Sequence, residues 1–455
     1  MGSLSSINLN SLLSAFGSSS TGINVPAAVA QAMAALSGPE QQWQAEQVTL
    51  QSQTNDINSI LKDISGLTDA LSALGDPAGA ITSMATTSSN SGIATASAAA
   101  GTVAGNHVVV VNNLATTASW YSNSVASSST ALAAGGFDLQ VGSGAPTHVT
   151  IGSGVNTLDQ LVTYINGLNQ GVTASVVNDS TGSRLAIVST ASGSAANFTI
   201  SNPSGLTFTQ GVAGNDASLT VDGIPIQSAS NTVTGAVAGL TFNLQGAAPG
   251  TQVNIGVAPD ATQISKAVSN FVDAYNTAIK DVNSVYAVDG NNKQGSLASD
   301  STLRILQDDL LSAANYTAGS GAITSLAGLG VTMNNDGTLS VDNSALTNAV
   351  QNNFADVQAF MQGAASNGFA ATLKAQLNTL SDPTTGAFTV DLQSIKNQNT
   401  DLQNNIDNFQ AYLNTQQTLL TAQYNQADIL LQELPNQLAQ INAQLGLNTN
   451  NKQGG

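Results

Sequence analysis

The C-terminal part of this chain carries an apolar residue at almost every seventh position. This first heptad line contains Leu392, Asn399, Ile406, Leu413, Leu420, Ala427, Leu434 and Ile441. A second line, which runs three and later four residues further on, contains Ile395, Leu402, Phe409, Tyr424, Leu431, Leu438 and Leu445. Two lines with this spacing share one face of a helix and indicate a coiled-coil seam. A helix with such a face needs a partner.

The N-terminal part offers a helix with the same step. Its heptad line contains Trp43, Leu50, Ile57, Ile64 and Leu71, and the later members are accompanied by Ile60, Leu67 and Leu74. We therefore expect the first and last parts of the chain to pack together as a coiled-coil leg. A monomeric helical bundle could bury the same lines. Residues 392–445 would however extend about 80 Å as a helix, which a compact domain would not cover.

Polar residues and one proline weaken the seam. Asn399, Gln416 and Gln417 lie on or beside the heptad lines, and polar core positions commonly specify a register or a partner at some cost in stability. Pro435 lacks a backbone N–H and clashes with the preceding turn of a helix. We therefore expect a kink or a break after Leu434.

The charge and composition of the chain exclude several classes of function. Only nine of the 455 residues are Lys or Arg, and the formal net charge is −18. We therefore expect no binding to nucleic acids or to anionic membranes. No apolar run reaches the length of a membrane span, and residues 1–22 carry no positive charge, so neither membrane insertion nor a cleaved signal is expected. The absence of Cys excludes disulfides and thiolate metal sites.

The apolar periodicity changes twice along the chain. It is helical up to Leu74, alternates with a period of two from about residue 94 to 257, and is helical again from Asp260. The strands that we expect in the middle part are 107–112, 137–141, 148–151, 172–177, 184–190, 197–201, 218–221, 240–244 and 252–257. One helix is expected inside this part, with Thr157 as its N-cap. Further helices are indicated by the stripes 264–282, 303–310, 346–361 and 369–380.

This order predicts a multidomain α+β fold, in which terminal helices form a coiled-coil leg and a helical bundle and mostly antiparallel β-domains are inserted between them. The parts that we expect are a flexible N-terminal segment with a short helix (1–40), the leg (41–75 with 388–447), the helical bundle (76–94 with 258–387), a first β-domain (95–135 with 215–257), a second, inserted α+β domain (136–214) and a flexible tail (448–455).

The sequence contains no recognisable catalytic or cofactor-binding motif. His107 and His148 both begin alternating strand segments, where a histidine at a strand end is far commoner than a general base. The segment 289–300 departs from a calcium-binding loop because it has Lys293 at the fifth position and no glycine at the sixth. We expect no enzymatic activity, no cofactor and no metal.

Several segments, taken in order, resemble one known family. They are Asn106–Leu114, Thr157–Asn166, Gly171–Asp179, Arg184–Ser189, Ser230–Val233, Gly239–Leu244, Phe271–Asn276, Leu329–Val331, Asp336–Leu339 with Asp342, and Tyr424–Leu445. Their order and spacing resemble the flagellar filament cap proteins, also called hook-associated protein 2. The hexapeptide Phe271–Asn276 is the most specific piece. The N-terminus departs from the family, since Ser20–Asn24 replaces its Ser-Gly-Leu-Asp motif.

The resemblance implies a structural protein that forms a homo-oligomeric ring, with five subunits as the first expectation, at the distal tip of the bacterial flagellum. Flagellin and an export chaperone are the implied partners, and export through the flagellar type III apparatus is the implied route to the extracellular filament. The expected leg or oligomer interface consists of Trp43, Leu50, Ile57, Ile64, Leu71, Ile406, Phe409, Leu413, Leu420, Tyr424, Leu431, Leu434, Leu438 and Ile441. Phe271, Val272, Tyr275 and Asn276 are expected to pack as the family motif.

Two other classes stay open at this point. A hook-filament junction protein or a flagellin also ends in helical heptads, although the hexapeptide argues against both. Alternatively, the β-domains could belong to a secreted adhesin that binds a host or surface ligand. Few aromatic residues are present for stacking on sugars, since Phe, Trp and Tyr together make up 4% of the chain.

Overall fold

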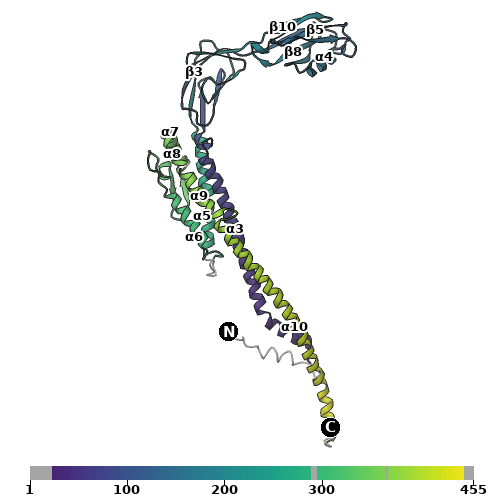
Figure 1. The fold of residues 1–455 in the computed structure, drawn as a ribbon, viewed down its shortest axis with the longest axis vertical. Coiled ribbons are helices and arrows are strands. Elements are labelled where there is room, and N and C mark those ends of the chain that lie inside the picture. Colours follow the sequence, from purple (N-terminus) through teal and green to yellow (C-terminus); the bar gives the residue numbers. More distant parts are fainter. Residues whose placement is uncertain (1–22, 288–294, 364–366, 445–455) are drawn as a thin grey trace, which may run out of the picture. The chain divides into compact units, whose positions relative to one another are not determined.

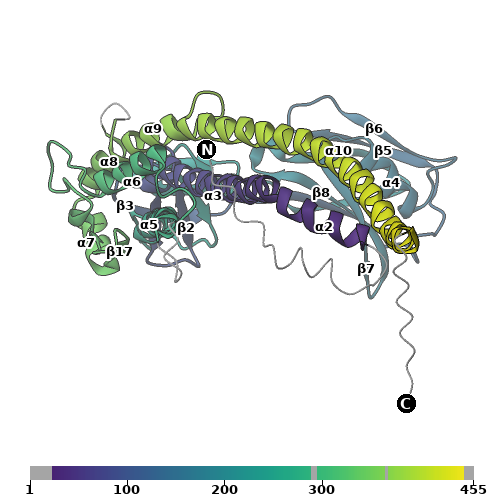
Figure 2. The same ribbon diagram turned by 90° about the horizontal axis from the view of Figure 1, so that it is seen from below.

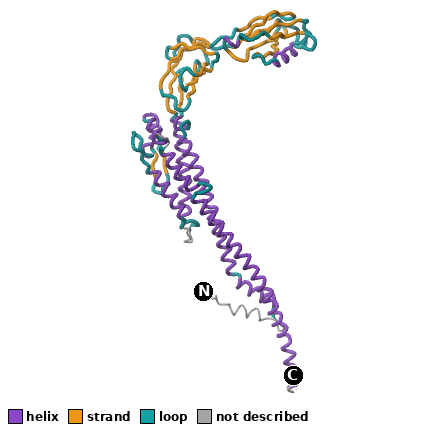
Figure 3. Tube along the Cα trace, in the orientation of Figure 1, coloured by secondary structure: helices purple, strands orange, loops and turns teal. Residues whose placement is uncertain are grey.

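The computed structural model describes residues 23–287, 295–363 and 367–444. It confirms an α+β fold with helices near both ends of the chain and antiparallel sheets between them (Figures 1 and 3). The chain divides into two compact units. The first comprises the described residues of 1–68, 274–311 and 375–455, and the second comprises those of 69–273 and 312–374.

The first unit is helical. It is built from all or parts of α2 (Val25–Leu36), α3 (Gly38–Gly75), α5 (Ala261–Tyr286), α6 (Ser301–Ala314), α9 (Phe369–Ser381) and α10 (Ala387–Gln444). Asn24 caps α2 by accepting a hydrogen bond from the Ala27 N–H, as is common at helix starts. In Figures 1 and 2, α3 and α10 run side by side.

In the second unit, two sheets enclose one apolar core. The five-stranded sheet has the order β1-β15-β3-β11-β12 and the three-stranded sheet the order β13-β14-β2. Their strands are β1 (Met84–Ser88), β2 (Ala94–Ala98), β3 (Gly105–Asn113), β11 (Ala217–Val221), β12 (Ile224–Ser228), β13 (Thr232–Thr234), β14 (Leu240–Leu244) and β15 (Val253–Pro259). Phe242, Val109 and Ile255 are fully buried between the sheets. We call this part the first β-body.

A second apolar core lies within the same unit and defines the second β-body. Its sheets have the orders β10-β4-β8-β7 and β6-β5-β9, and α4 (Leu158–Gly167) shares their core. The strands are β4 (Thr117–Ser122), β5 (Gly135–Val141), β6 (Thr147–Ile151), β7 (Val172–Asp179), β8 (Gly182–Ser192), β9 (Phe198–Ser204) and β10 (Phe208–Val212). Thr157 caps α4 by accepting from the Gln160 N–H, as the sequence predicts.

The remainder of the second unit is short helices and one small hairpin. It contains the 3-10 turns η1 (Ala80–Thr82) and η3 (Ala327–Leu329), the strands β16 (Val331–Met333) and β17 (Leu339–Val341), and the helices α7 (Asn343–Asn352) and α8 (Phe354–Gln362). A further 3-10 turn, η2 (Ser194–Ala196), lies in the second β-body. The single apolar stripe that we expected over 346–361 is thus divided between two helices at Asn353.

The structure places three segments differently from the sequence prediction. We grouped residues 76–94 with the helical bundle, but β1 pairs with β15 as an edge of the five-stranded sheet. We grouped residues 95–135 with the first β-domain, but β4 pairs with β8 and β10 of the second β-body. Of the kink or break that we expected after Leu434, the break is wrong, because α10 continues through Pro435 to Gln444.

Candidate functional site

The first part of the predicted seam is buried. Leu50, Ile57 and Ile64 of α3 are at most 6% exposed, and Ile406 and Leu413 of α10 are at most 8% exposed. Apolar side chains at this spacing form one buried stripe along each helix, which removes their surface from water. Leu71, the last residue of the N-terminal heptad line, is also buried, in the second unit.

An aromatic pair lies along the seam. The rings of Trp43 on α3 and Phe409 on α10 meet edge to face, with 5.4 Å between their centroids. This geometry places the positive edge of one ring against the negative face of the other. The structure therefore brings these two predicted interface residues together within a single subunit.

Polar contacts fix the direction in which the N-terminal helices run along α10. The Gln47 amide donates to Gln403 at 3.1 Å, and the Gln410 amide donates to Glu40 at 2.7 Å. Closer to the C-terminus, the Ile23 N–H donates to the Asp428 carboxylate at 2.6 Å. As residue numbers fall from Gln47 to Ile23, their partners rise from Gln403 to Asp428, so the two segments are antiparallel.

The last part of the seam is exposed. Leu420, Tyr424 and Ala427 are partly buried. The four heptad residues that follow are exposed: Leu431, Leu434, Leu438 and Ile441 have exposed fractions of 45%, 47%, 53% and 50%. We call these four residues the distal stripe. Among the described residues nothing buries them, and Leu445, which continues the line, lies outside the described part. The sequence predicted the stripe but not that the described residues leave it exposed.

The hexapeptide Phe271–Asn276 has a packing role in α5. Phe271 is fully buried and meets Phe369 edge to face at 5.4 Å, and Val272 is also buried. The Tyr275 hydroxyl donates to the Leu310 carbonyl at 3.0 Å, and burial raises the pKa of Tyr275 to about 12. Asn276 is partly buried. Phe271, Val272 and Tyr275 are thus part of the packed interior.

Acidic residues connect α3 with α5 and the segment before α6. Asp63 lies near Asp281. The pKa of Asp63 is raised to about 6, mainly because the carboxyl is partly buried and secondly because the Asp281 carboxyl is next to it. The Ser59 hydroxyl donates to Asp281 at 3.2 Å. Asp56 accepts from the Ser296 hydroxyl. Sequence reasoning missed this group, because α3 and α5 carry the two carboxyls at positions far apart in the chain.

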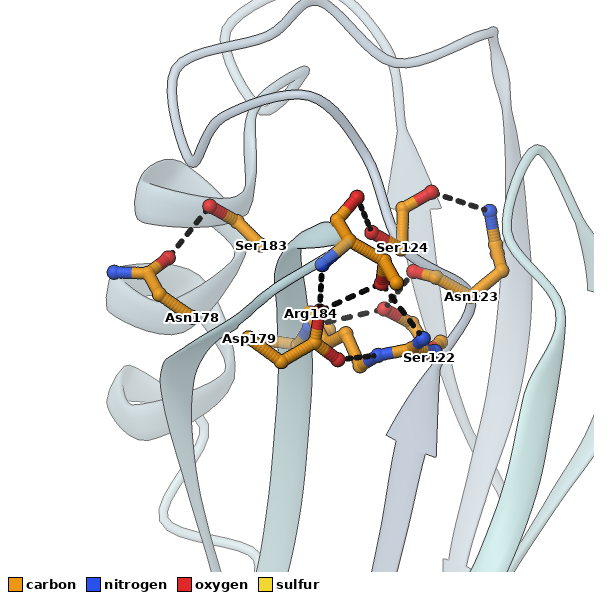
Figure 4. A network of polar contacts seen from close by, with 9 residues as sticks. Ser122, Asn123, Ser124, Asn178, Asp179, Ser183 and Arg184 are labelled. Carbon is orange, nitrogen blue, oxygen red and sulfur yellow. Dashed lines mark hydrogen bonds and ion pairs between the residues drawn. The ribbon is translucent and has the colours of Figure 1, made fainter.

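A polar network closes one end of the second β-body (Figure 4). The Arg184 guanidinium donates to Asp179 at 2.6 Å, to the Ser122 carbonyl at 3.1 Å and to the Thr181 hydroxyl at 3.2 Å. Hydrogen bonds from Thr181 and then from Arg184 hold the pKa of Asp179 well below its usual range. Because Arg184 already has these three partners, we assign the network to fixing the β7–β8 turn against β4.

An open hollow beside α4 is the feature that best fits the adhesin hypothesis. It has a volume of about 480 Å³ and is lined by Asn166, Asn169, Gly171, Val172, Thr173 and Thr190. The Asn166 side-chain amide already has hydrogen-bond partners, since it donates to the Ala174 carbonyl and accepts from the Ala174 N–H. No aromatic side chain lines the hollow for stacking on a sugar, so the structure gives the adhesin hypothesis little support.

Each histidine is paired with an aspartate. His107 contacts Asp222 at 2.7 Å and His148 contacts Asp138 at 2.6 Å. Over residues 23–287, 295–363 and 367–444, no group of three or more acidic or histidine side chains is arranged to hold a metal ion. Part of the 289–300 segment lies outside those ranges. In the same described part of the chain, no helix has the length and apolarity to cross a membrane.

Solved structures support the fold. The flagellar cap protein FliD D1-D2-D3 domains from Escherichia coli superpose with a TM-score of 0.62 at 24% sequence identity, covering 75% of this chain and 99% of that chain. At this level of identity the similarity establishes the architecture alone.

Sequence comparisons identify relatives along most of the chain. The B-type flagellar hook-associated protein 2 of Pseudomonas aeruginosa is 28% identical over 393 residues, covering 78% of this chain and 82% of the relative. The flagellar hook-associated protein 2 of Aeromonas caviae is 28% identical over 331 residues, covering 67% and 70% respectively.

Family models match both ends of the chain and its middle. The model of the flagellar hook-associated protein 2 N-terminus matches residues 21–118, and the model of the C-terminus of the same family matches residues 214–436. The flagellin hook IN motif matches residues 137–191. The first two models together account for more than half of the sequence, and the structure has the fold of a solved cap protein, so this chain belongs to the flagellar hook-associated protein 2 family.

Proposed function

We propose that this protein is a structural cap at the distal tip of the bacterial flagellar filament. The distal stripe carries the proposal: a two-helix leg ends in a helix whose apolar face the described part of the same subunit leaves exposed. An apolar helix face of this kind is suited to packing against another helix. In a filament tip, that other helix would belong to the outermost flagellin subunits.

We propose further that several copies form a ring, with five as the first value to test. In this arrangement the leg residues, including the heptad residues of α3 and α10, are inserted between flagellin subunits, and new flagellin folds beneath the ring. Export through the flagellar type III apparatus, with the help of a chaperone, would bring the subunits to the extracellular tip. The absence of Cys suits a chain that is exported unfolded.

The weak charge of the chain suggests how a cap could move as the filament grows. Charged residues make up 8% of the sequence, so contacts of the leg would be mainly apolar and hydrogen-bonded. Such contacts act over short distances and are weakly dependent on salt. In a binding assay, we expect the affinity of purified cap for filament ends to change little between about 50 and about 500 mM salt. A steep loss of binding with salt would indicate electrostatic attachment and would contradict this mechanism.

The function is tested by deleting the gene and examining cells and medium by electron microscopy. We expect short or missing filaments and flagellin in the medium, and the wild-type gene should restore filaments. Normal filaments in the deletion strain would refute the proposal.

Two matched variants then test the distal stripe. Leu434→Asp with Leu438→Asp places two charges on the stripe, whereas Asn436→Asp with Gln440→Asp places two charges on the opposite face of the same turns of α10. All four residues are exposed, so neither variant should unfold the described core. We expect the first variant to fail to restore filaments and the second to restore them. Equal restoration by both would remove the stripe from the mechanism.

A further inference from the structure

The four-stranded sheet of the second β-body ends in two strands that have one neighbour each. In the described part of the chain, β7 pairs only with β8, and β10 pairs only with β4. Each of these two edge strands therefore presents a row of backbone N–H and C=O groups that no strand of the same copy bonds. Such a row is a template for pairing with a strand of another molecule.

Several other edge strands of the described sheets are protected. Natural edge strands are usually blunted by a proline, by a short length or by a covering segment. β12 contains Pro225 and β9 contains Pro203, and a proline has no N–H to donate. β13 has only three residues. β1 and β2 cover each other, because the Thr86 and Ser88 hydroxyls of β1 donate to carbonyls of β2.

The edge of β7 is protected over its first half only. Asn166 of α4 donates to the Ala174 carbonyl and accepts from the Ala174 N–H, so it takes the place of a neighbouring strand at that residue. Alternate residues of a strand direct their backbone groups to the same edge, so those of Val176 and Asn178 point the same way as those of Ala174. The cover ends at Ala174 and leaves an open edge over 175–179, which matches the five residues of β10 in length.

The strand directions suit a head-to-tail contact between two copies. The pairs β10–β4, β4–β8 and β7–β8 are all antiparallel. Because the sheet has four strands that alternate in direction, its two edge strands run in opposite directions. A second copy placed beside the first in the same orientation would therefore set its β10 antiparallel to β7 and continue the ladder. Such a contact joins two different edges, and its repetition can close a ring.

The side chains at the two edges are compatible with this contact. The register of the sheet places Val177 of β7 and Val212 of β10 on its outer face, where they are 49% and 47% exposed. Asp179, the last residue of β7, is already paired with Arg184 (Figure 4), and β10 has no charged residue. Two copies of an acidic chain can therefore approach here without net repulsion.

We propose that β7 of one copy pairs antiparallel with β10 of a second copy, over residues 175–179 and 208–212, with Val177 and Val212 on the same face of the joined sheet. Strand addition of this kind draws its affinity from main-chain hydrogen bonds. A ladder of about five residues is a small interface, so one contact is weak and a closed ring, in which each copy makes two, is stronger. The use of this contact in a cap rests on the function proposed above.

Charged substitutions on the outer face test the contact without touching the core. Val177→Lys places a charge in the open part of β7, whereas Thr173→Lys places the same charge on the same face of the strand, before Ala174. Self-association of the full-length protein is measured by sedimentation over a concentration series. We expect Val177→Lys to weaken association about fivefold, as for the loss of one cross-strand pair, and Thr173→Lys to leave it unchanged.

A compensating charge makes the test specific to the two edges. Addition of Val212→Glu to Val177→Lys should restore association, because the opposite charges then meet across the joint between two copies. Equal weakening by Val177→Lys and Thr173→Lys, or no restoration by Val212→Glu, would overturn the proposal. A wild-type protein that stays monomeric at every concentration would overturn it as well.

Because the chain has no Cys, engineered cysteines can establish which edges meet. Val177 must lie opposite one of the two outer-face residues of β10, which are Thr209 and Val212. The Val177→Cys protein is therefore mixed with the Thr209→Cys or the Val212→Cys protein, oxidised mildly and run on non-reducing gels. We expect at least about tenfold more crosslinked dimer in one of the two mixtures than in any variant alone, because the contact raises the local thiol concentration.

Two results of the crosslinking would contradict the proposal. A dimer formed as readily by Val177→Cys alone would mean that two β7 edges meet, and no excess of dimer in either mixture would mean that β7 and β10 do not meet. Both measurements use the isolated protein. Normal filaments in the deletion strain would thus refute the cap function without affecting them, and failure of the contact would leave the cap function standing.

Discussion

Replacing Leu413 by Ala tests whether the heptad line of α10 is a packed core. Leu413 is 8% exposed, and Leu419, on the same helix, is 48% exposed. Leu→Ala removes three carbons, worth about 2.4 kcal/mol when fully buried at ~0.8 kcal/mol each. Scaled by burial, Leu413→Ala loses about 2.2 kcal/mol plus a cavity cost, giving roughly 3 kcal/mol. Leu419→Ala loses about 1 kcal/mol or less, since part of its burial is against its own helix.

Trp43 provides the signal for this comparison, because its ring packs on Phe409 of the same seam. Urea unfolding is followed by tryptophan fluorescence, and a Trp43→Phe version of each variant identifies the part of the signal that comes from the seam. At a slope of about 2 kcal/mol per M, the midpoint should fall by about 1.5 M for Leu413→Ala and by about 0.5 M or less for Leu419→Ala. Equal shifts would refute the assignment of Leu413 to a packed seam.

Three further predictions concern other parts of the chain. Because the folded-state pKa of Asp63 is raised to about 6, stability should fall as pH rises from about 4 to 6, and Asp63→Asn should remove this fall and stabilise the protein at pH 7 in thermal melts. Asn166→Ala should cost about 1–3 kcal/mol in urea unfolding, because it leaves the N–H and C=O of Ala174 without their partner. Gly223→Ala should cost about 1 kcal/mol, because Gly223 has φ +80°, where a residue with a Cβ is strained. The added methyl group itself would meet open space. Unchanged stability in any of these variants would contradict the physical reason given for it.

The sequence predicts the elements that have a strong period and misses those that do not. The alternation in 184–190 gives β8, whose Leu185 and Ile187 are fully buried on one side. β1 reads Met-Ala-Thr-Thr-Ser, and only its first residue is buried, so no alternation marks it. β13 has three residues, which is too short for a period to appear. Such strands are fixed by their neighbours in the sheet.

The heptad lines of α10 have a buried part and an exposed part, and the sequence does not show where one ends and the other begins. Leu413 and Leu434 belong to one heptad line, but the first is buried and the second is about half exposed. Heptad spacing reports that a helix has an apolar face; it carries no information on where the partner helix ends. That limit is set by Ile23 at Asp428, a contact between residues at opposite ends of the chain. The Asp63–Asp281 group is invisible in the sequence because it depends on a similarly distant pairing.

Pro435 shows which of two sequence signals decides the course of α10. A proline inside a helix costs about 3 kcal/mol and argues for a break. The heptad residues nevertheless keep their phase across it, since Leu431 and Leu434 before the proline share a face with Leu438 and Ile441 after it. A break would rotate the two pairs apart, whereas α10 runs continuously through Pro435. The unbroken phase of the heptad residues is therefore the stronger of the two signals at Pro435.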